Sequence, residues 1–260
     1  MRTPWAPLLF LAAGCATAPA YVVPDVSISA EDQRHDPLKL GPELIEKRET
    51  PGSLERAIAL LRWHWKQQPE SVDLNALLAE AHSRMCEVLD LKKPEDRPPH
   101  LEHRTAGLHH AREAVQIDPG HAPAQYWLGS LLLHAAEAES SLGRTNEALK
   151  HLERAEALHA SVDDGGPARL RGRVLQDMPG IFGGSVSKAI ACYRRSLEAA
   201  PGAMSTRLYL GEAYLAIDKP DLARAELQHV TASKARAGHE KEDRDLHRKA
   251  EELLRKLHEP

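Results

Sequence analysis

Hydrophobic and small residues recur along most of this chain with the spacing of one face of an α-helix. In five places a small residue is followed four positions later by a bulkier or apolar residue. A third member of the pattern lies seven positions after the first residue, and a proline often lies twelve positions after it. The sets are Ala57/Leu61/His64/Pro69, Gly107/Ala111/Ala114/Pro119, Ala148/Leu152/Ala155/Ala160, Ala189/Tyr193/Ser196/Pro201 and Ala223/Leu227/Val230/Ala235. Positions 0, 4 and 7 share one side of a helix, and proline ends the helix because it cannot continue the hydrogen-bond ladder.

A second pattern precedes four of these helices and predicts a partner helix for each. The sets are Leu78-Ala79-x-x-His82, Leu128-Gly129-x-x-Leu132, Arg171-Gly172-x-x-Leu175 and Leu210-Gly211-x-x-Tyr214. The small central residue allows two antiparallel helices to approach closely, and such hairpins must stack on their neighbours to bury their apolar faces. We therefore expect residues 42–260 to form one all-α domain of about five hairpins.

This arrangement resembles the tetratricopeptide repeat (TPR). The pattern is met best in the last hairpin, where Gly211 and Ala223 lie twelve positions apart, and the earlier hairpins are longer. Residues 240–259 follow as a capping helix, because opposite charges lie at i,i+4 spacing around a single stripe of leucines. The alternative for this helix is a docking element for a partner protein.

The first fifteen residues have the features of an export signal. Arg2 is followed by a short apolar stretch, Ala6 to Ala13, and then by the Gly14-Cys15 junction. Such a stretch is too short to span a bilayer. The junction resembles the lipobox of bacterial lipoproteins, which implies that Cys15 is lipidated; cleavage nearby, with Cys15 discarded, is the alternative.

Residues 16–41 contain three prolines and little periodicity, and we expect them to form an extended tether. Together these features predict an exported, periplasmic lipoprotein that is anchored to a membrane, with the outer membrane favoured. The two other cysteines, Cys86 and Cys192, fall in hairpins two apart and outside any CxxC motif. We expect both to be buried free thiols.

The composition and the motif content of the chain argue against several classes of function. The net charge of −4 argues against a general nucleic-acid binder, and an aromatic content of only 4% favours an Ala/Leu helical core over sheets. The sequence contains no GxSxG, Walker A or HExxH motif, so an enzyme is not expected, and no cofactor is predicted.

The chain resembles the T component of tripartite ATP-independent periplasmic (TRAP) transporters in three features. These are residues 163–173, the dipeptides Pro179-Gly180 and Gly183-Gly184, and the lengthened hairpins. The resemblance implies a periplasmic lipoprotein that self-associates as a trimer with a pore and meets a solute-binding protein.

Counting around the first helix of each hairpin predicts a concave binding surface. The candidate residues for a ligand or partner are Glu80, Arg84, Tyr126, Ser130, Leu133, His134, Arg169, Arg173, Gln176, Asp177, Leu208, Glu212 and Leu215. Arg169 and Arg173 lie one turn apart, as a pair that recognises carboxylates would, although they could equally be solvated surface charges. Phe182 is flanked by glycines and would cover the edge of the groove or plug a pore; the alternative is a helix connection with a buried Phe.

Fifteen histidines raise the question of metal binding, since His100, His103, His109 and His110 cluster and His103 and His110 share a helical face. We interpret them as structural or pH-responsive surface histidines, because no further ligand motif accompanies them. The sequence thus predicts a non-enzymatic binding subunit similar to a TRAP T component, which docks a solute-binding protein or small ligand. The alternative is an envelope scaffold that holds a peptide segment in its groove, and a weaker third is metal or proton sensing.

Overall fold

The computed structural model describes residues 28–257, which contain eleven α-helices, three short 3₁₀ helices and no β-strand. The 3₁₀ helices are η1 (Asp32–Arg34), η2 (Pro94–Asp96) and η3 (Gly180–Phe182). The α-helices are α1 (Pro37–Glu46), α2 (Ser53–Trp65), α3 (Val72–Val88), α4 (Arg97–Ile117), α5 (Ala122–Glu139), α6 (Leu142–Leu158), α7 (Gly166–Asp177), α8 (Val186–Ala199), α9 (Met204–Ala216), α10 (Pro220–Ala232) and α11 (Glu240–Lys256).

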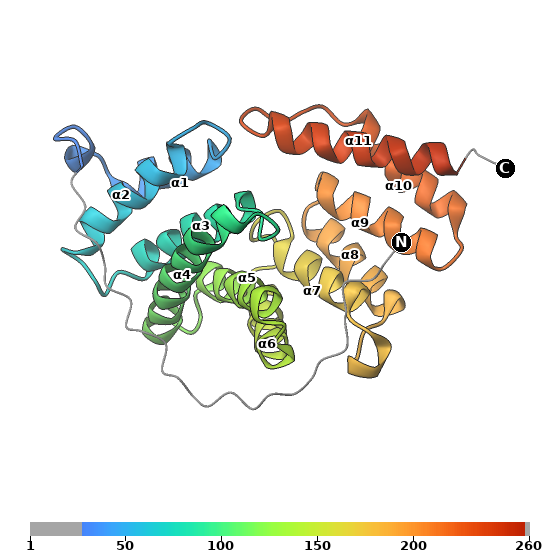
Figure 1. Cartoon of the computed structure of the whole chain (residues 1–260), viewed down its shortest axis with the longest axis horizontal. Coiled ribbons are helices and arrows are strands. Elements are labelled where there is room, and N and C mark those ends of the chain that lie inside the picture. The colour runs from blue at the N-terminus through green and yellow to red at the C-terminus, as the bar shows by residue number, and fades with distance from the viewer. Residues whose placement is uncertain (1–27, 258–260) are drawn as a thin grey trace.

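The helices pack as five consecutive hairpins, α1/α2 to α9/α10, which follow one another along an arc (Figure 1). Each second helix also packs on the first helix of the next hairpin. The first helices α3, α5, α7 and α9 contact one another in turn, whereas no second helix in residues 28–257 touches another. The first helices therefore line the inside of the arc, and the predicted all-α hairpin solenoid is confirmed.

Small residues allow the helices of a hairpin to approach closely. A Cβ atom added at Gly129 would lie 2.8 Å from Leu152, and one at Gly172 would lie 2.5 Å from the ring of Tyr193. Both neighbours are fully buried. The pattern that predicted the hairpins therefore marks the sites of closest helix contact.

The last helix, α11, covers the exposed end of the solenoid. Its leucine stripe, which includes Leu246 and Leu254, packs against the buried Leu227 and Val230 of α10. The opposite side of α11 is charged. Because one side of α11 is apolar and packed on α10 while the other side is charged and faces solvent, the predicted role of this helix as a cap is confirmed.

The helical domain begins before the expected boundary at residue 41. Helix α1 starts at Pro37, because proline suits the first helical position and the Asp36 side chain accepts a hydrogen bond from the amide of Leu38 at 3.0 Å. Asp32 is buried and paired with Arg56 at 2.6 Å. Residues 32–41 are therefore part of the fold and not of an extended tether; the predicted signal with Cys15 and residues 16–27 lie outside the described residues.

Cys86 and Cys192 are both buried and unpaired, as predicted. Burial raises the pKa of the Cys86 thiol to about 12. Across residues 28–257, none of the helices combines the length and apolar character needed to cross a membrane.

Candidate functional site

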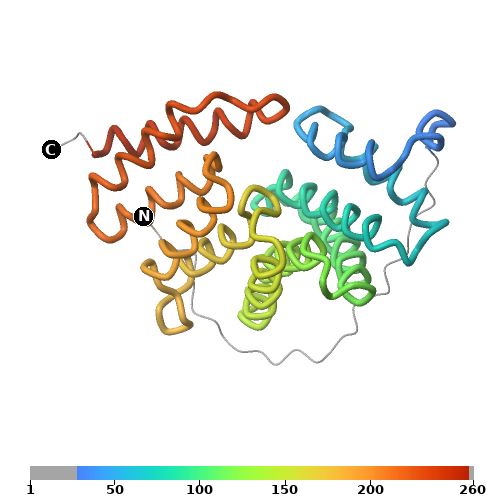
Figure 2. Tube along the Cα trace, turned by 180° about the vertical axis from the view of Figure 1, so that it is seen from behind, coloured from blue at the N-terminus to red at the C-terminus, as the bar shows by residue number. Residues whose placement is uncertain are grey.

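The inside of the arc carries a row of polar side chains that are held in place by one another. The Cα trace seen from behind shows the inner helices in order, with α11 closing the arc near α1 (Figure 2). Two clusters of ion pairs and a set of contacts between the two ends of the solenoid organise this surface.

The first cluster centres on Asp163, in the turn between α6 and α7. Asp163 and Asp164 adopt left-handed backbone angles, with φ of 49° and 52°, which aspartate tolerates better than most residues. The Asp163 carboxylate accepts hydrogen bonds from the guanidinium of Arg84, the hydroxyl of Tyr126 and, at 2.7 Å, the guanidinium of Arg169. Burial alone would raise the pKa of Asp163, but Arg84 and Arg169 outweigh burial and lower the pKa to about 2.

The second cluster joins α7, α9 and α11. Arg173 donates to Glu212 at 3.1 Å and pairs with Asp177 at 2.9 Å, and Lys249 of α11 pairs with Glu212 at 2.6 Å. The guanidinium of Arg173 lies 5.0 Å from the ring centre of Tyr209. Both side chains are partly exposed, and arginine and tyrosine are enriched among the residues that contribute most to protein interfaces.

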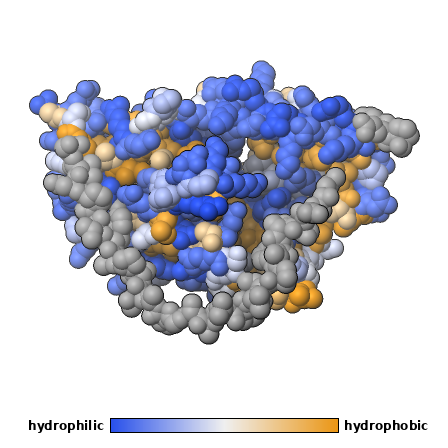
Figure 3. All heavy atoms as spheres, in the orientation of Figure 1, coloured by the Kyte–Doolittle hydropathy of each residue, from blue (hydrophilic) through white to orange (hydrophobic). Residues whose placement is uncertain are grey.

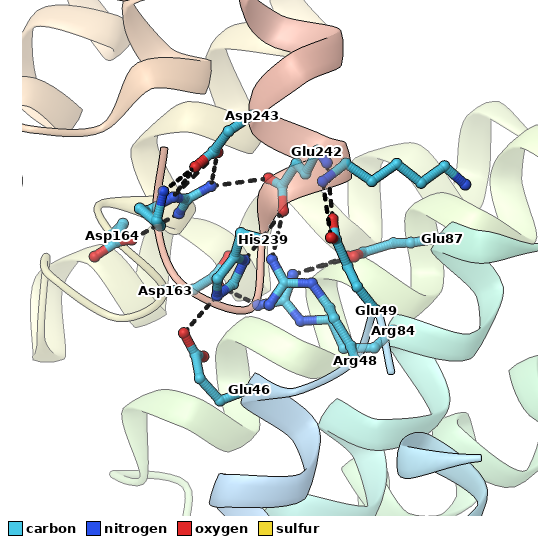
Figure 4. Close-up of polar contacts among 12 residues, drawn as sticks. Glu46, Arg48, Glu49, Arg84, Glu87, Asp163, Asp164, His239, Glu242 and Asp243 are labelled. Carbon is cyan, nitrogen blue, oxygen red and sulfur yellow. Dashed lines mark hydrogen bonds and ion pairs between the residues drawn. The ribbon is translucent and has the colours of Figure 1, made fainter. Parts of the chain in front are cut away.

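The two ends of the solenoid meet beside the first cluster, through contacts that we call the clasp (Figure 4). Arg48, after α1, donates to Glu242 of α11 at 2.6 Å. The Glu49 carboxylate accepts from the amides of Lys241 and Glu242 at 2.8 and 2.7 Å, and so caps the start of α11. His239 shares a hydrogen bond with Glu46. The clasp consists of these residues, Glu46, Arg48, Glu49, His239, Lys241 and Glu242.

Arg236 ties the clasp to the first cluster. Its guanidinium binds Asp243 at 2.8 Å and Glu242 at 3.4 Å, and it approaches Asp164 to 3.7 Å. Hydrophilic residues consequently dominate the surface around the start of α11, and the surface is hollowed below them (Figure 3).

The structure brings several of the predicted site residues together. Arg84, Tyr126 and Arg169 meet at Asp163, and Arg173 and Glu212 meet in the second cluster. The Ser130 and Ser83 hydroxyls share a hydrogen bond of 3.0 Å, and Gln176 accepts one from Tyr193 at 2.7 Å. The His134 ring lies edge-on to His100, with centroids 5.8 Å apart.

Other predicted site residues are placed differently. Leu208 is 1% exposed and lies in the core beneath α11, because its side of α9 is covered by the cap. Arg169 and Arg173 do not form a free pair for a carboxylate ligand, since Arg169 is occupied by Asp163 and by the backbone carbonyls of residues 163 and 164. Phe182 is half-exposed in η3 and belongs to none of the core clusters.

The histidine cluster differs from the expected surface histidines. His82, His100 and His110 are buried, with exposures of 2% or less, and burial lowers the pKa of His110 to about 3 and that of His100 to about 4. His82 and His103 share a hydrogen bond of 3.0 Å between their Nδ1 atoms, and His110 binds Asn75 at 2.9 Å. Within residues 28–257 no three His, Cys, Asp or Glu side chains are grouped as a metal site requires.

Sequence reasoning missed the two features that organise the site. Asp163 lies in the segment 163–173 that carries the family resemblance, and the run Asp163-Asp164-Gly165, typical of a turn with left-handed residues, is the signal that could have identified it. The clasp joins residues 194 positions apart, as in Arg48 and Glu242, and no local pattern indicates such a contact.

Comparison with known proteins supports the fold. No protein-family model matches the sequence, and no curated protein matches it. Among solved structures, the chain is similar to a thermophilic TPR protein of Thermus thermophilus, with a TM-score of 0.58 and 21% identity over 84% of this chain and 97% of that one. It is also similar to PilF of Pseudomonas aeruginosa, with a TM-score of 0.51 and 18% identity over 85% and 90% of the two chains.

Human IFIT1, solved as a dimer with PPP-AAAA, gives a TM-score of 0.52 at 20% identity, over 86% of this chain and 50% of that one. Identities this low show the fold alone. The chain has a TPR-type fold.

Proposed function

We propose that this protein is a non-enzymatic scaffold that holds a peptide segment of a partner protein against the inner face of its solenoid. The observation that carries the proposal is the continuous surface of α3, α5, α7 and α9, where ion pairs fix Arg84, Arg169 and Arg173 before any partner arrives. A surface fixed in this way loses little conformational entropy on binding, so more of the interaction energy appears as affinity.

The anchor of this surface is Arg173 stacked on Tyr209. Both side chains are partly exposed, and arginine and tyrosine contribute more than most residues at interfaces. Together with Glu212 and Asp177 they offer an aromatic face and charges of both signs within one turn of neighbouring helices. An extended peptide can meet such a mixed surface with its backbone and with alternate side chains.

A peptide-selection experiment tests the proposal. Dodecapeptides displayed on phage are selected against the purified protein, and the tightest binders are synthesised and measured by fluorescence polarisation. We expect Arg173→Ala to weaken their binding by about 5- to 30-fold, corresponding to about 1–2 kcal/mol. Arg154→Ala, an exposed arginine on the second helix α6, is the matched control and should leave binding unchanged.

Two outcomes contradict the proposal. If no peptide binds more tightly than about 1 mM, the inner face is not a peptide site. If the selected peptides bind both variants as they bind the wild type, they bind elsewhere on the molecule.

A TRAP T component-like subunit, self-associating as a trimer and docking a periplasmic solute-binding protein, is the second candidate. It rests on the sequence resemblance of residues 163–201, part of which has an internal role here, because Asp163 fixes Arg84 and Arg169. Light scattering on a sizing column separates the two candidates. A single trimeric species supports the transport subunit, and a monomer supports the scaffold.

Export and lipidation at Cys15 belong to the same proposal and would place the solenoid in the periplasm, anchored to the outer membrane. Metabolic labelling with a fatty acid, with Cys15→Ala as the control, tests this directly. Label that persists in Cys15→Ala would show that Cys15 is not the lipidated residue.

A further inference from the structure

Glu80 is the one predicted inner-face carboxylate that forms no ion pair or hydrogen bond within residues 28–257. It lies on α3, four residues before Arg84 and seven before Glu87, so the three side chains share one side of the helix. That side of α3 faces the Asp163 cluster, because Arg84 binds both Glu87 and Asp163. Glu80 is therefore directed toward the inner surface beside the clasp.

The cations close to Glu80 are already occupied. Arg84 is held by Asp163 and Glu87, and Arg48 is held by Glu242 of the clasp. Arg48, Arg84, Glu87 and Asp163 are the charged groups that act on Glu80. Carboxylates outnumber guanidinium groups in this part of the molecule, where Glu46, Glu49, Asp164 and Asp243 also gather (Figure 4). Within residues 28–257 the Glu80 carboxyl group is thus left without a paired cation.

The environment of Glu80 also shifts its protonation. Burial raises its pKa from 4.5 to about 7, and the nearby arginines offset the effect of burial only in part. The side chain still has a partial opening to solvent. A carboxylate that is desolvated, unpaired and reachable gains more from an incoming cation than an exposed one does.

We propose that Glu80 is the recognition site for an ammonium group, carried by a lysine side chain or by the N-terminus of the bound peptide. The inference rests on the proposed function, because it names the chemical class of segment that the inner face selects. The three donors of an ammonium group would satisfy the Glu80 carboxylate and leave the existing pairs of Arg48 and Arg84 intact.

Three peptide mixtures test the proposal and separate the two sources of the ammonium group. The first consists of N-acetylated octapeptides with a fixed central lysine, the second has norleucine in its place, and the third has norleucine and a free N-terminus. All other positions are randomised. At pH 8 we expect the lysine mixture, the free-amine mixture or both to bind at least about fivefold more tightly than the acetylated norleucine mixture.

The pH dependence supplies a second readout. A carboxyl group with a pKa of about 7 is about 90% ionised at pH 8 and about 10% ionised at pH 6. The affinity for the lysine mixture, whose side-chain ammonium group stays charged throughout this range, should therefore fall up to about tenfold from pH 8 to pH 6. Glu80→Gln should abolish both the preference and this dependence. Glu137→Gln, an exposed carboxylate on α5, should change neither. A pH dependence of the same size in Glu80→Gln would contradict the assignment to Glu80.

The outcomes separate this inference from the proposed function. Equal binding of all three mixtures overturns the ammonium site and leaves the peptide scaffold standing, as does a preference that survives Glu80→Gln. If no mixture binds, the peptide scaffold fails. A titration of the wild-type protein with n-butylammonium then tests the ammonium site independently of any peptide. When n-butylammonium is added, a shift of the Glu80 carboxyl ¹³C resonance and a lowered pKa of Glu80 support the ammonium site. The absence of any shift refutes the site. This measurement uses the wild-type protein and does not depend on how a variant folds.

Discussion

Asp163→Asn removes the charge at the centre of the inner face with almost no change in shape. Asparagine tolerates the left-handed backbone at this position, so the turn itself should survive. The variant leaves the guanidinium groups of Arg84 and Arg169 in place without the carboxylate that neutralises them. The substitution therefore tests the ion-pair cluster and not the turn.

The magnitude follows from the pKa of Asp163, which is about 2 in the fold and 3.8 in an ordinary aspartate. This difference is worth about 2.4 kcal/mol at neutral pH. Removing one partner of a buried ion pair costs about 3–5 kcal/mol, because the opposite charge stays buried. We expect the free energy of unfolding at pH 7 to fall by about 2–5 kcal/mol.

The direction of the pH dependence is fixed by the same values. Because the folded pKa is lower than the unfolded one, the stabilisation by Asp163 is complete well above pH 4 and is lost as the pH falls toward 2. At pH 3 about half of it remains. The difference in stability between wild type and Asp163→Asn should therefore shrink on acidification.

Urea unfolding followed by circular dichroism at pH 7 and pH 3 measures these quantities. Asp164→Asn is the matched control, because Asp164 has the same backbone conformation, its side chain is 70% exposed and its carboxylate makes a 3.7 Å contact with Arg236. We expect Asp164→Asn to change stability by less than about 0.5 kcal/mol. Equal losses in the two variants, or none in Asp163→Asn, would refute the role of the Asp163 charge.

Three further predictions concern the core, a thiol and the clasp. Gly172→Ala should lower the free energy of unfolding by about 1–2 kcal/mol, because its methyl group meets the ring of Tyr193, whereas Gly143→Ala in α6 should raise it by up to about 1 kcal/mol, because its methyl group meets only the Ser141 hydroxyl at 3.9 Å. Urea titrations that rank the two variants in the opposite order would contradict the packing argument. Cys86 should react with a thiol reagent at pH 8 only as fast as the protein opens, because it is buried and its thiol stays protonated; rapid labelling of the native protein would show otherwise. Arg48→Met should speed hydrogen exchange in the first turn of α11 at least severalfold, and unchanged exchange there would mean that Arg48 does not hold the clasp.

Local patterns predicted the fold well and the site only in part. Helix pairing was readable because Gly129, Gly172 and Gly211 mark close contacts between neighbours in sequence. The side chains on the inner face were identified by helical counting, but their partners were not. Whether Arg169 is free or bound depends on a turn that brings Asp163 to it, and Leu208 is buried only because α11 returns over α9. Such contacts depend on the path of the whole chain.

The contact between the first hairpin and the capping helix α11 also affects how the molecule unfolds. An open solenoid behaves as a linear array, in which each repeat is stabilised only by its neighbours and the terminal repeats fray first. Here Arg48 and Glu49 join α11 to the first hairpin, so neither terminal repeat has a free edge at the clasp. Fraying at either end must break the same contacts, and the two ends should loosen together. The protein then unfolds more like a closed ring than like a row of independent repeats.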